Sequence, residues 1–573
     1  MGNPYPDYMM ESVKRVEATR EKRRHKFYPE VSKEQRITEE TAKKLLNNYH
    51  PDYREDFKRK LKIGPAKGKL VPNEVANALE AYPRVNPEKV DLSQVDYSAD
   101  VLVIGTGGAG LSAVLWANNQ GIKMEDILVS TKLRLGDSNS KMSQGGIQAA
   151  DKEDDSPMIH WLDVMSGGHW TNKPELAEDL VMDGPLVIKW LEELGAEFDK
   201  EADGEMMTRR PGGASRMRLH SCKDYTGLEL TRVLMDEAQS RGINTLEFCP
   251  AVSLLTDSNG AVSGALLWNM ETEEYHVVRA KSTLLATGGF GRLHVGGFPT
   301  TNHYGATFDG VVSAYRVGAN LQHLEYSQYH PTGAAYPEQI VGLLVTEKCR
   351  SMHAQLVNDE GEAFIYPLET RDVEAAAEIN EYKQGRAIVT PTDQPGVWLD
   401  TPLINEIHGE GAFKKNLSAI YRLYTRFDID PTEYPVLVWP TLHYQNGGVA
   451  INDQTQVLDV NDTPIGNLFA AGETTGGVHG DNRLMGNSWL EIVVYGRKAG
   501  ISAARHAKNM KMPAKDELSL AHLNRYSQKL QDAGIKTDRR TPVILPNYLD
   551  ENAMKTIGYG EEEPLKRRLD LFH

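Results

Sequence analysis

The chain has 573 residues, enough for more than one domain with its own core, and its 40% hydrophobic and 25% charged residues are ordinary for a globular protein. A net charge of −16 argues against binding to nucleic acid or to an anionic membrane surface. The three cysteines, Cys222, Cys249 and Cys349, form no Cys-x-x-Cys pair, which argues against a disulfide framework, a bound iron–sulfur cluster or a c-type haem. There is neither a signal pattern nor a run of about 18 apolar residues, so we expect a cytoplasmic protein without a membrane span of its own.

Residues 1–96 differ in composition from the rest of the chain. They are crowded with Lys, Arg and Glu, and the stretch SKEQRITEETAKKLLNNYH (32–50) is typical of a charged helix with a thin apolar stripe. Two interpretations of this extension stay open: a segment surrounded by solvent, or an arm that lies on a partner protein.

A βαβ pattern begins at residue 100. The stretch DVLVIGTGGAGLSAVLWANNQG (100–121) predicts a buried strand, a glycine turn and an apolar helix, and DILVS (126–130) predicts the next strand. The turn carries Gly-x-Gly-x-x-Gly at Gly105, Gly107 and Gly110. These glycines allow a tight turn and a close approach of the backbone to a pyrophosphate at the helix N-terminus. The pattern therefore predicts nucleotide binding.

The end of the second strand departs from the simple NAD pattern. An acidic residue usually follows about 20 positions after the glycines and binds the adenosine ribose. Here the strand ends in Ser-Thr-Lys (130–132), and none of these residues is an acid. The ribose must therefore be held in another way.

Two later segments resemble further strands of the same sheet. STLLATGGFG (282–291) is an apolar strand that ends in Thr-Gly-Gly, and NLFAAGETTGG (467–477) is another that ends in an acid. Glu473, just beyond the second of these strands, is well placed to bind a ribityl or ribose hydroxyl, although it could instead be the acid that begins a helix. Strand–glycine–ligand patterns spread over nearly 400 residues indicate a flavoprotein with a domain inserted before the last strand.

The stretch GLLVTEKCRS (342–351) has two interpretations of its own. An apolar run changes into Thr-Glu-Lys-Cys-Arg without a turn residue. It could be a helix capped by Thr346 with its polar residues in solvent, or a strand that brings Glu347 and Arg350 to a reaction. Taken alone, the stretch favours the first interpretation.

Other polar clusters stand beside Gly or Pro, where functional loops are common: EYSQYHPTG, ETRDVEA, PTLHYQNGGV and HGDNRLMGNSWLE. Each has an ordinary structural interpretation. His330 could cap a turn, Arg371 could form a surface pair with the aspartate after it, His443 could be a core histidine, and Arg483 could be a solvated loop residue. Four such coincidences in one chain are improbable, which favours an active site.

With these motifs in order, the chain resembles the flavoprotein subunit of succinate dehydrogenase and fumarate reductase, a family that includes soluble fumarate reductases and L-aspartate oxidase. The resemblance covers residues 97–505. It rests on His-Pro-Thr-Gly, Thr-Glu-x-Cys-Arg, Arg-Asp, His-Tyr-x-x-Gly-Gly and His-Gly-x-Asn-Arg-Leu followed by Asn-Ser.

The resemblance implies that some of these residues transfer protons and that others bind the substrate. A flavin would pass a hydride to one carbon of a C4 dicarboxylate while Arg371 protonates the other carbon. Glu347 and Arg350 would form with Arg371 a relay of protons from solvent. On this view the TEKCR stretch belongs to the active site. The residues expected to hold the two carboxylates are His330, Thr346, His443 and Arg483.

The cofactor implied is FAD. The residues expected to bind it are Gly105, Gly107, Gly108, Ala109, Gly110, Ser130, Lys132, Ser138, Asn139, Ser140, Gln144, Gly145, Gly146, Ala286, Thr287, Gly288, Asp309, Glu473, Arg483, Ser488 and Trp489.

Two positions depart from parts of the family. Respiratory members attach FAD through a histidine, but the matching stretch SNSKMSQGGIQAA carries Asn139 in its place, so we expect non-covalent FAD and a preference for fumarate reduction. Aspartate oxidases carry an acid that recognises the substrate's amino group, where this chain has Pro211 in RRPGGAS. We therefore rank aspartate oxidation below fumarate reduction.

The fold class expected is α/β, with a Rossmann-like FAD-binding domain, an inserted α+β capping domain, an N-terminal extension and a short helical C-terminal segment. The expected limits are 1–96 for the extension, 97–330 and 441–505 for the two parts of the FAD-binding domain, 331–440 for the capping domain and 506–573 for the C-terminal segment.

Electrons must reach such a chain from outside, because it has no cluster, haem or second flavin motif. We expect an iron–sulfur partner subunit, which could also hold the chain at a membrane. Two alternatives stay open: the same chemistry on another unsaturated acid or on L-aspartate, and a non-catalytic electron-transfer flavoprotein. The physiological donor and the direction of the reaction do not follow from the sequence.

Overall fold

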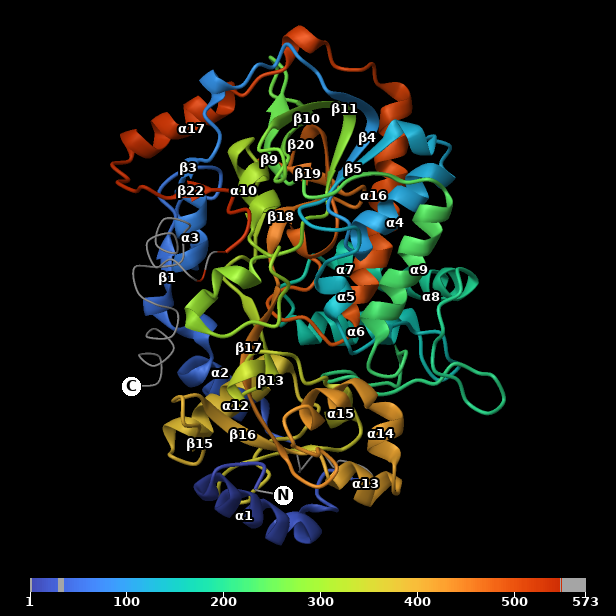
Figure 1. Ribbon diagram of the computed structural model, residues 1–573, viewed down its shortest axis with the longest axis vertical. Coiled ribbons are helices and arrows are strands. Elements are labelled where there is room, and N and C mark those ends of the chain that lie inside the picture. The colour runs from blue at the N-terminus through green and yellow to red at the C-terminus, as the bar shows by residue number, and fades with distance from the viewer. Residues whose placement is uncertain (1–2, 29–35, 547, 549–573) are drawn as a thin grey trace.

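The computed structural model describes residues 3–28, 36–546 and 548. Its upper part in Figure 1 surrounds a mostly parallel sheet, and its lower part surrounds a separate antiparallel sheet. Among the described residues, none of the helices is both long enough and apolar enough to span a bilayer.

The upper sheet confirms the strands expected from the sequence. Its main path in spatial order is β19 (Gln456–Leu458), β20 (Pro464–Ala470), β11 (Tyr275–Leu285), β4 (Tyr97–Ile104), β5 (Ile127–Ser130) and β8 (Asn244–Leu246). All neighbours from β20 to β8 are parallel. Their carboxyl ends therefore meet at one edge, which is where open α/β sheets bind ligands. The antiparallel strands β9 (Ala251–Thr256) and β10 (Val262–Trp268) extend the sheet from β11.

Helices cover this sheet because its strands are apolar on both faces. The residues of β4 from Val101 to Ile104 are buried, as are all residues of β5. The first βαβ helix, α4, packs along the long helix that follows the last strand. The helices around the sheet are α4 (Gly108–Asn119), α6 (Pro157–Gly167), α7 (Pro174–Met182), α8 (Gly184–Glu193), α9 (Thr226–Ser240), α10 (Asp309–Arg316) and α16 (Asn487–Asn509).

The lower part is built on a five-stranded antiparallel sheet. Its strands are β13 (Ser327–Ala334), β17 (Val436–Gln445), β16 (Pro395–Asp400), β14 (Gln355–Val357) and β15 (Ile388–Val389). Its helices are α11 (Lys348–Ser351), α12 (Arg371–Lys383), α13 (Leu403–His408), α14 (Ala412–Asn416) and α15 (Ser418–Thr425). Strands β13 and β17 also connect this part to the upper one, so residues on both can face the upper sheet.

The N-terminal extension lies on the chain's own body, which differs from both interpretations offered by the sequence. Helix α1 (Asp7–Arg23) buries Met9, Val13 and Val16 completely and packs under β16. Arg23 of this helix forms an ion pair with the buried Asp400, with 2.9 Å between Nη2 and Oδ2. The apolar side of α1 thus packs on this chain.

The rest of the extension continues along the molecule. The predicted charged helix is α2 (Glu39–Tyr49), which packs on α12, while residues 32–35 of the prediction lie outside the described residues. Asp52, just after it, accepts a hydrogen bond from the backbone N–H of Ser327 in β13 at 2.8 Å. Strands β1 (Lys58–Lys60) and β2 (Leu70–Pro72) and helix α3 (Asn73–Leu79) complete it.

The C-terminal segment contains helix α17 (Ala521–Asp532) and the short strand β22 (Arg540–Thr541), which pairs with β3 (Tyr82–Pro83) of the extension. The extension and the C-terminal segment therefore pack together on one flank of the upper part, where Figure 1 places α17, α3 and β3 side by side.

Candidate functional site

A cleft opens at the carboxyl ends of β4, β5 and β11. The glycine turn between β4 and α4 forms its floor, and the close packing there explains two of the glycines. Gly105 has a positive φ of 111°, and a Cβ on it would collide with the carbonyl oxygen of Ala286, just beyond the end of the neighbouring strand β11. A Cβ on Gly110 would collide with the carbonyl oxygen of Gly105. Only glycine allows the turn, the helix and the strand to approach this closely.

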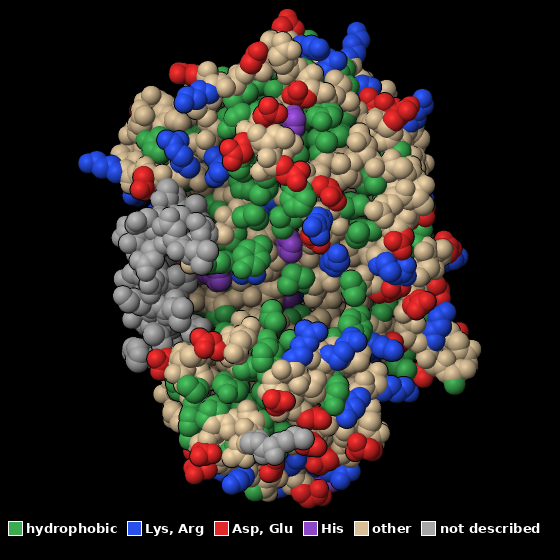
Figure 2. Space-filling view, viewed as in Figure 1, with side chains coloured by type: hydrophobic (Ala, Val, Ile, Leu, Met, Phe, Trp, Pro, Cys, Tyr) green, Lys and Arg blue, Asp and Glu red, His purple; other side chains and the backbone are tan. Residues whose placement is uncertain are grey.

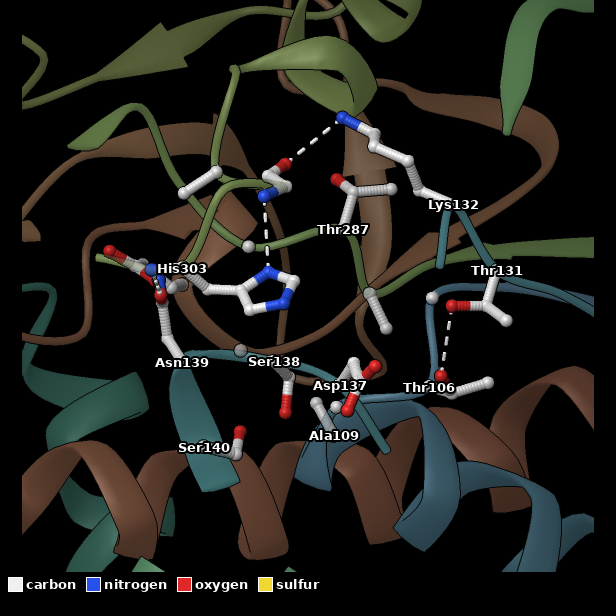
Figure 3. A pocket seen from close by; sticks show the side chains of 18 of the residues that line it. Thr106, Ala109, Thr131, Lys132, Asp137, Ser138, Asn139, Ser140, Thr287 and His303 are labelled. Carbon is white, nitrogen blue, oxygen red and sulfur yellow. Dashed lines mark hydrogen bonds between the residues drawn. The ribbon is translucent and has the colours of Figure 1, made fainter. Parts of the chain in front are cut away.

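Most of the expected cofactor residues line this cleft, as Figure 3 shows with Ser138 and Ala109 on one side and Thr287 and Lys132 on the other. Gly108 and Gly110 lie behind it as packing positions, the first donating its N–H to Ser140 Oγ at 3.1 Å. The expected residues that line the cleft are Gly105, Gly107, Ala109, Ser130, Lys132, Ser138, Asn139, Ser140, Ala286, Thr287, Gly288, Asp309, Glu473, Ser488 and Trp489.

An acid from a distant element lies near the end of the second strand. Asp309 begins α10 and faces Lys132 across the cleft, with 2.9 Å between Lys132 Nζ and Asp309 Oδ2. Its other oxygen, Oδ1, is buried and has no hydrogen-bond partner among the described residues. The same is true of Gln144 Oε1 nearby. A buried acceptor needs a donor, and the hydroxyl and amide groups of FAD are such donors, so the residues of the cleft fit this cofactor.

Asn139 lies fully hydrogen-bonded at the edge of the cleft. Its amide donates to Asn302 Oδ1 at 2.7 Å and to Glu473 Oε2 at 3.2 Å, and its oxygen accepts the N–H of His303 at 2.7 Å. Burial raises the pKa of Glu473 to about 7. These three contacts fix the orientation of the Asn139 amide at the edge of the cleft.

A small chamber adjoins the cleft and brings the remaining candidates together. It is lined by the loop residues 143–146 and 483–486, the start of α16, the strands β13 and β17, and the residues that lead into α11 and begin α12. Its candidate residues are Gln144, Gly145, Gly146, His330, Thr346, Glu347, Arg371, His443, Arg483, Ser488 and Trp489. Arg350 is absent from this lining and lies behind Glu347.

The two histidines come from paired strands. In the antiparallel register of β13 and β17, His330 stands opposite Thr441, which brings its ring to 5.0 Å from that of His443. Burial and the nearby charge of Arg371 lower the pKa of both imidazoles well below the usual value, so both are neutral at neutral pH. His443 is only partly buried and lines the chamber, which argues against an ordinary core histidine.

The TEKCR stretch agrees with one half of each interpretation: it begins a helix, and it places Glu347 and Arg350 inside the protein. It does begin a short helix, α11, and the side chain of Thr346 accepts the N–H of Lys348 at 3.3 Å. Its polar residues are nevertheless not in solvent, since Thr346, Glu347 and Arg350 are each 1% exposed. The helix therefore delivers the carboxylate and the guanidinium to the interior.

Glu347 is the centre of a buried network. Its Oε2 accepts hydrogen bonds from Arg371 Nε at 2.9 Å and from Arg350 Nη2 at 3.2 Å, and its Oε1 accepts the N–H of Gly212 at 2.7 Å. Burial acts to raise the pKa of Glu347, but the two guanidinium groups outweigh it and the pKa is below the usual value. Glu347 is therefore an ionised carboxylate between two cations.

Gln328 is a site residue that the motifs did not single out. Its Oε1 accepts from Arg371 Nη1 at 2.8 Å and from Arg483 Nη2 at 2.7 Å, so one amide oxygen separates two like charges. Its Nε2 donates to the backbone oxygen of Arg483 at 2.6 Å. The signal in the sequence was its place two residues before His330, since alternate residues of a strand share a face.

Arg483 is the buried cation of the chamber that lacks an acid. It is 2% exposed, and among the described residues no carboxylate lies within ion-pair distance of it. Its guanidinium stacks over the ring of Tyr444 at 4.4 Å, and its Nε has no hydrogen-bond partner in the described part of the chain. Burial and the nearby Arg371 lower its pKa to about 9. An uncompensated buried charge is costly, so this geometry calls for an anionic ligand.

A second hollow adjoins the chamber at Gln144 and His443. The described residues that line it include Arg422 and Arg426 of the α15 region and no Asp or Glu. Figure 2 shows Lys and Arg side chains along one rim of the groove between the two parts of the molecule. The chain as a whole has a net charge of −16. A positively charged entrance on such a chain attracts anionic ligands toward the chamber.

The comparisons with known proteins agree with this geometry. A model of the FAD binding domain family matches residues 100–489. The chain is 38% identical to a protein of Methanothermobacter marburgensis that is named as one subunit of the fumarate reductase (CoM/CoB), over 72% of this chain and 73% of that protein. It is 34% identical to L-aspartate oxidase of Streptomyces coelicolor, over 72% and 69% respectively. Among solved structures, a variant of FrdA from E. coli quinol fumarate reductase matches with a TM-score of 0.68 and 27% identity, covering 81% of this chain and 78% of that one.

Proposed function

The chain belongs to the family of FAD-dependent oxidoreductases that contains the flavoprotein subunits of fumarate reductase and succinate dehydrogenase, and on that premise we propose that it reduces fumarate to succinate. The observation that carries the proposal is the chamber itself. It places Arg483, a buried cation with no acid partner among the described residues, near a second cation, Arg371, that pairs with a carboxylate. A dicarboxylate would supply the missing negative charge.

Four groups support a clamp on the two carboxylates. Arg483 can bind one of them through donors that the protein leaves available, including Nε. The neutral rings of His330 and His443 can each donate one hydrogen bond, and the hydroxyl of Thr346 can donate another. Bound FAD would supply hydride transfer to one carbon of the C=C bond. The clamp would hold that bond against the cleft side of the chamber.

Arg371 would then protonate the other carbon. A guanidinium has a pKa above about 12. It can act as an acid only if a neighbouring group reprotonates it at once. The contact with Glu347 supports this role, because it connects Arg371 to Arg350 through one carboxylate. The same contact fixes the orientation of the guanidinium toward the chamber.

Oxidation of L-aspartate is the weaker candidate. An ammonium group in the chamber would need a carboxylate partner, and the acid that lines the described chamber is Glu347, which two arginines already neutralise. Pro211 offers no charge, and the next residue in its loop, Gly212, donates to the same Glu347. These contacts favour a substrate without an amino group.

The function is tested by supplying electrons artificially. The purified FAD-loaded chain is assayed with reduced methyl viologen against fumarate, mesaconate and crotonate. Turnover should be fastest with fumarate, slower with mesaconate because of its extra methyl group, and lost with crotonate, which lacks the second carboxylate. Crotonate turnover equal to that of fumarate would contradict the dicarboxylate clamp.

We propose that the FAD is bound without a covalent link. Asn139 stands where the linking histidine of respiratory members stands, and an amide cannot form the covalent bond that an imidazole forms with the flavin. Acid precipitation should therefore release essentially all of the FAD into the supernatant. A protein band that keeps flavin fluorescence in a denaturing gel would contradict this prediction.

We further propose that electrons come from an iron–sulfur partner subunit. The three cysteines of the chain are buried and form no disulfide, and the part of the chain that the structure describes holds no group of three or more His, Cys, Asp or Glu side chains placed to bind a metal. The similar Methanothermobacter protein is itself named as one subunit of its reductase. Co-purification of the native complex, followed by iron analysis, tests this partner.

A further inference from the structure

Helix α12 carries two buried acids behind the chamber. Glu374 and Glu378 follow Arg371, the first residue of the helix, at three and seven positions. Residues spaced by three and four lie on one face of an α-helix, so the three side chains form one row. Both glutamates are 0% exposed. The mechanism described above uses neither of them.

Glu374 continues the network beyond Arg350. Arg350 Nη1 donates to both carboxyl oxygens of Glu374, at 2.5 Å for Oε1, while Nη2 donates to Glu347. A carboxylate can accept at both oxygens in this way. Carboxylates and hydrogen bonds around it raise the pKa of Arg350 despite its burial, so its charge is maintained. An unbroken chain of contacts therefore runs from Arg371 through Glu347 and Arg350 to Glu374.

Glu378 stands at the end of this row without a partner. Both of its carboxyl oxygens are buried, and neither has a hydrogen bond to any described residue. The charged groups that act on it are Glu374, which opposes its ionisation, and Arg350, which favours it. Burial is the largest effect, and the pKa of Glu378 is well above the usual value. Burial also raises the pKa of Glu374 well above the usual value, so the two neighbouring buried carboxyls share a proton. The ion pair of Glu374 with Arg350 favours its ionised form, which leaves the proton on Glu378.

Glu378 holds the next dissociable proton in this row. Once Arg371 gives up its proton, Glu347 has no proton of its own to return. Glu347 is ionised, because it lies between two arginines. Arg350 would have to become neutral, and Glu374 is paired with it. A replacement proton must therefore start from Glu378.

We propose that Glu374 and Glu378 extend the proton relay beyond Arg350, with Glu378 as the acid that replaces the proton donated by Arg371. This inference rests on the proposed fumarate reduction. Glu378 lies one helical turn from Glu374 and has no hydrogen bond to it at rest, so its side chain must first rotate to bring the O–H to Glu374. The O–H bond of Glu378 then breaks as a proton passes to Glu374, Glu374 passes one to Arg350, Arg350 to Glu347 and Glu347 to Arg371. Each group forms one bond to hydrogen and breaks one, and a proton from solvent later restores Glu378. Glu374 and Glu378 are thus positioning and supply residues, not residues that touch the substrate.

The test compares Glu378→Leu, Glu378→Gln and Glu378→Asp with a control on the same helix. Glu381→Gln is that control, since Glu381 is also buried but is fully paired with Arg386 and Asn358. The reduced, FAD-loaded enzyme is mixed with fumarate over a range of pH and its reoxidation is followed by stopped flow. Melting temperatures are measured in parallel.

The wild-type reoxidation rate should fall as the pH rises through the pKa of Glu378. The Leu and Gln variants should lose this pH-dependent fall and react about 10²-fold more slowly, the lower end of the range for a positioned proton donor. Glu378→Asp should recover part of the rate, and Glu381→Gln should react like wild type. Glu378→Leu should melt no lower than wild type, because it removes an unsatisfied buried carboxyl.

Either of two results would overturn the proposal: wild-type rates and pH dependence in Glu378→Leu, or the same loss of rate in Glu381→Gln. If the leucine variant does not fold, Glu378→Gln decides by the same kinetics. Absence of fumarate reduction in the wild-type enzyme would reject the proposed function instead, and the two failures are therefore distinguishable.

Discussion

Replacing Arg371 with lysine should leave FAD and fumarate bound but slow reoxidation of the reduced enzyme by fumarate about 10²–10⁴-fold, the range that general acid catalysis contributes. The positive charge remains in this variant. However, Arg371 donates from Nε to Glu347 and from Nη1 to Gln328 at the same time, and the single ammonium of lysine cannot hold both contacts in that geometry. The proton donor would lose both its position and its path of resupply.

Stopped-flow traces separate this effect from general damage. Reduction of the bound flavin by an artificial donor precedes proton donation and should be nearly normal in Arg371→Lys. Glu347→Gln should slow reoxidation to a similar extent, because the amide interrupts the path to Arg350. Arg386→Lys is the matched control, since Arg386 pairs with Glu381 beyond the end of α12 and lies outside the chamber. Near-wild-type reoxidation in Arg371→Lys would mean that the proton comes from another group.

Replacing Arg483 with methionine should weaken dicarboxylate binding by about 3 kcal/mol or more, which is over about 100-fold in Kd. Methionine keeps much of the apolar volume but removes the buried cation that has no acid partner among the described residues. Titration of the oxidised enzyme with succinate, followed by the flavin absorbance, measures the change. The FAD content is measured as well, because Arg483 lies beside the cleft. An unchanged Kd for succinate would contradict the clamp.

The same residue predicts how binding depends on pH. In the free protein, burial and Arg371 lower the pKa of Arg483 to about 9. Only the charged guanidinium binds the dianion well, so affinity should be constant below this pH. Above it, the Kd should rise about tenfold per pH unit, because each unit removes nine-tenths of the remaining charged form. The Arg483→Met variant should lack this dependence.

The contrast between Gln328 and Arg371 shows what sequence patterns can reveal about a site. Arg371 was found because it stands in a specific Arg-Asp motif. Gln328 was not, because an uncharged amide two residues before a histidine has many ordinary explanations. Its role depends on two arginines that are 43 and 155 residues away in the chain. Contacts over such separations are products of folding, and the two-residue spacing from His330 was the one local signal for Gln328.

The buried acids of α12 were equally hidden in the sequence. An Arg-Asp-Val-Glu-Ala-Ala-Ala-Glu sequence resembles an exposed, charged helix, and the sequence suggested no role for Glu374 or Glu378. Packing of α12 against the five-stranded sheet and against α2 of the N-terminal extension encloses them. Whether a carboxyl is solvated or carries a functional proton is decided by those neighbours.

The sequence by itself determined the parts of this protein that depend on local geometry. A strand, a glycine turn and a helix form a nucleotide site through the conformations of adjacent residues, and the apolar runs of β4, β5, β11 and β20 predicted one sheet. The specific motifs also determined the family. Only the tertiary structure decided the rest: that the extension packs on its own chain, and that, among the described residues, Arg483 lacks an acid and Glu378 lacks a partner. Burial, charge pairing and the pKa shifts they cause are set by residues far apart in sequence, because they depend on what folding removes from water and brings within a few ångströms.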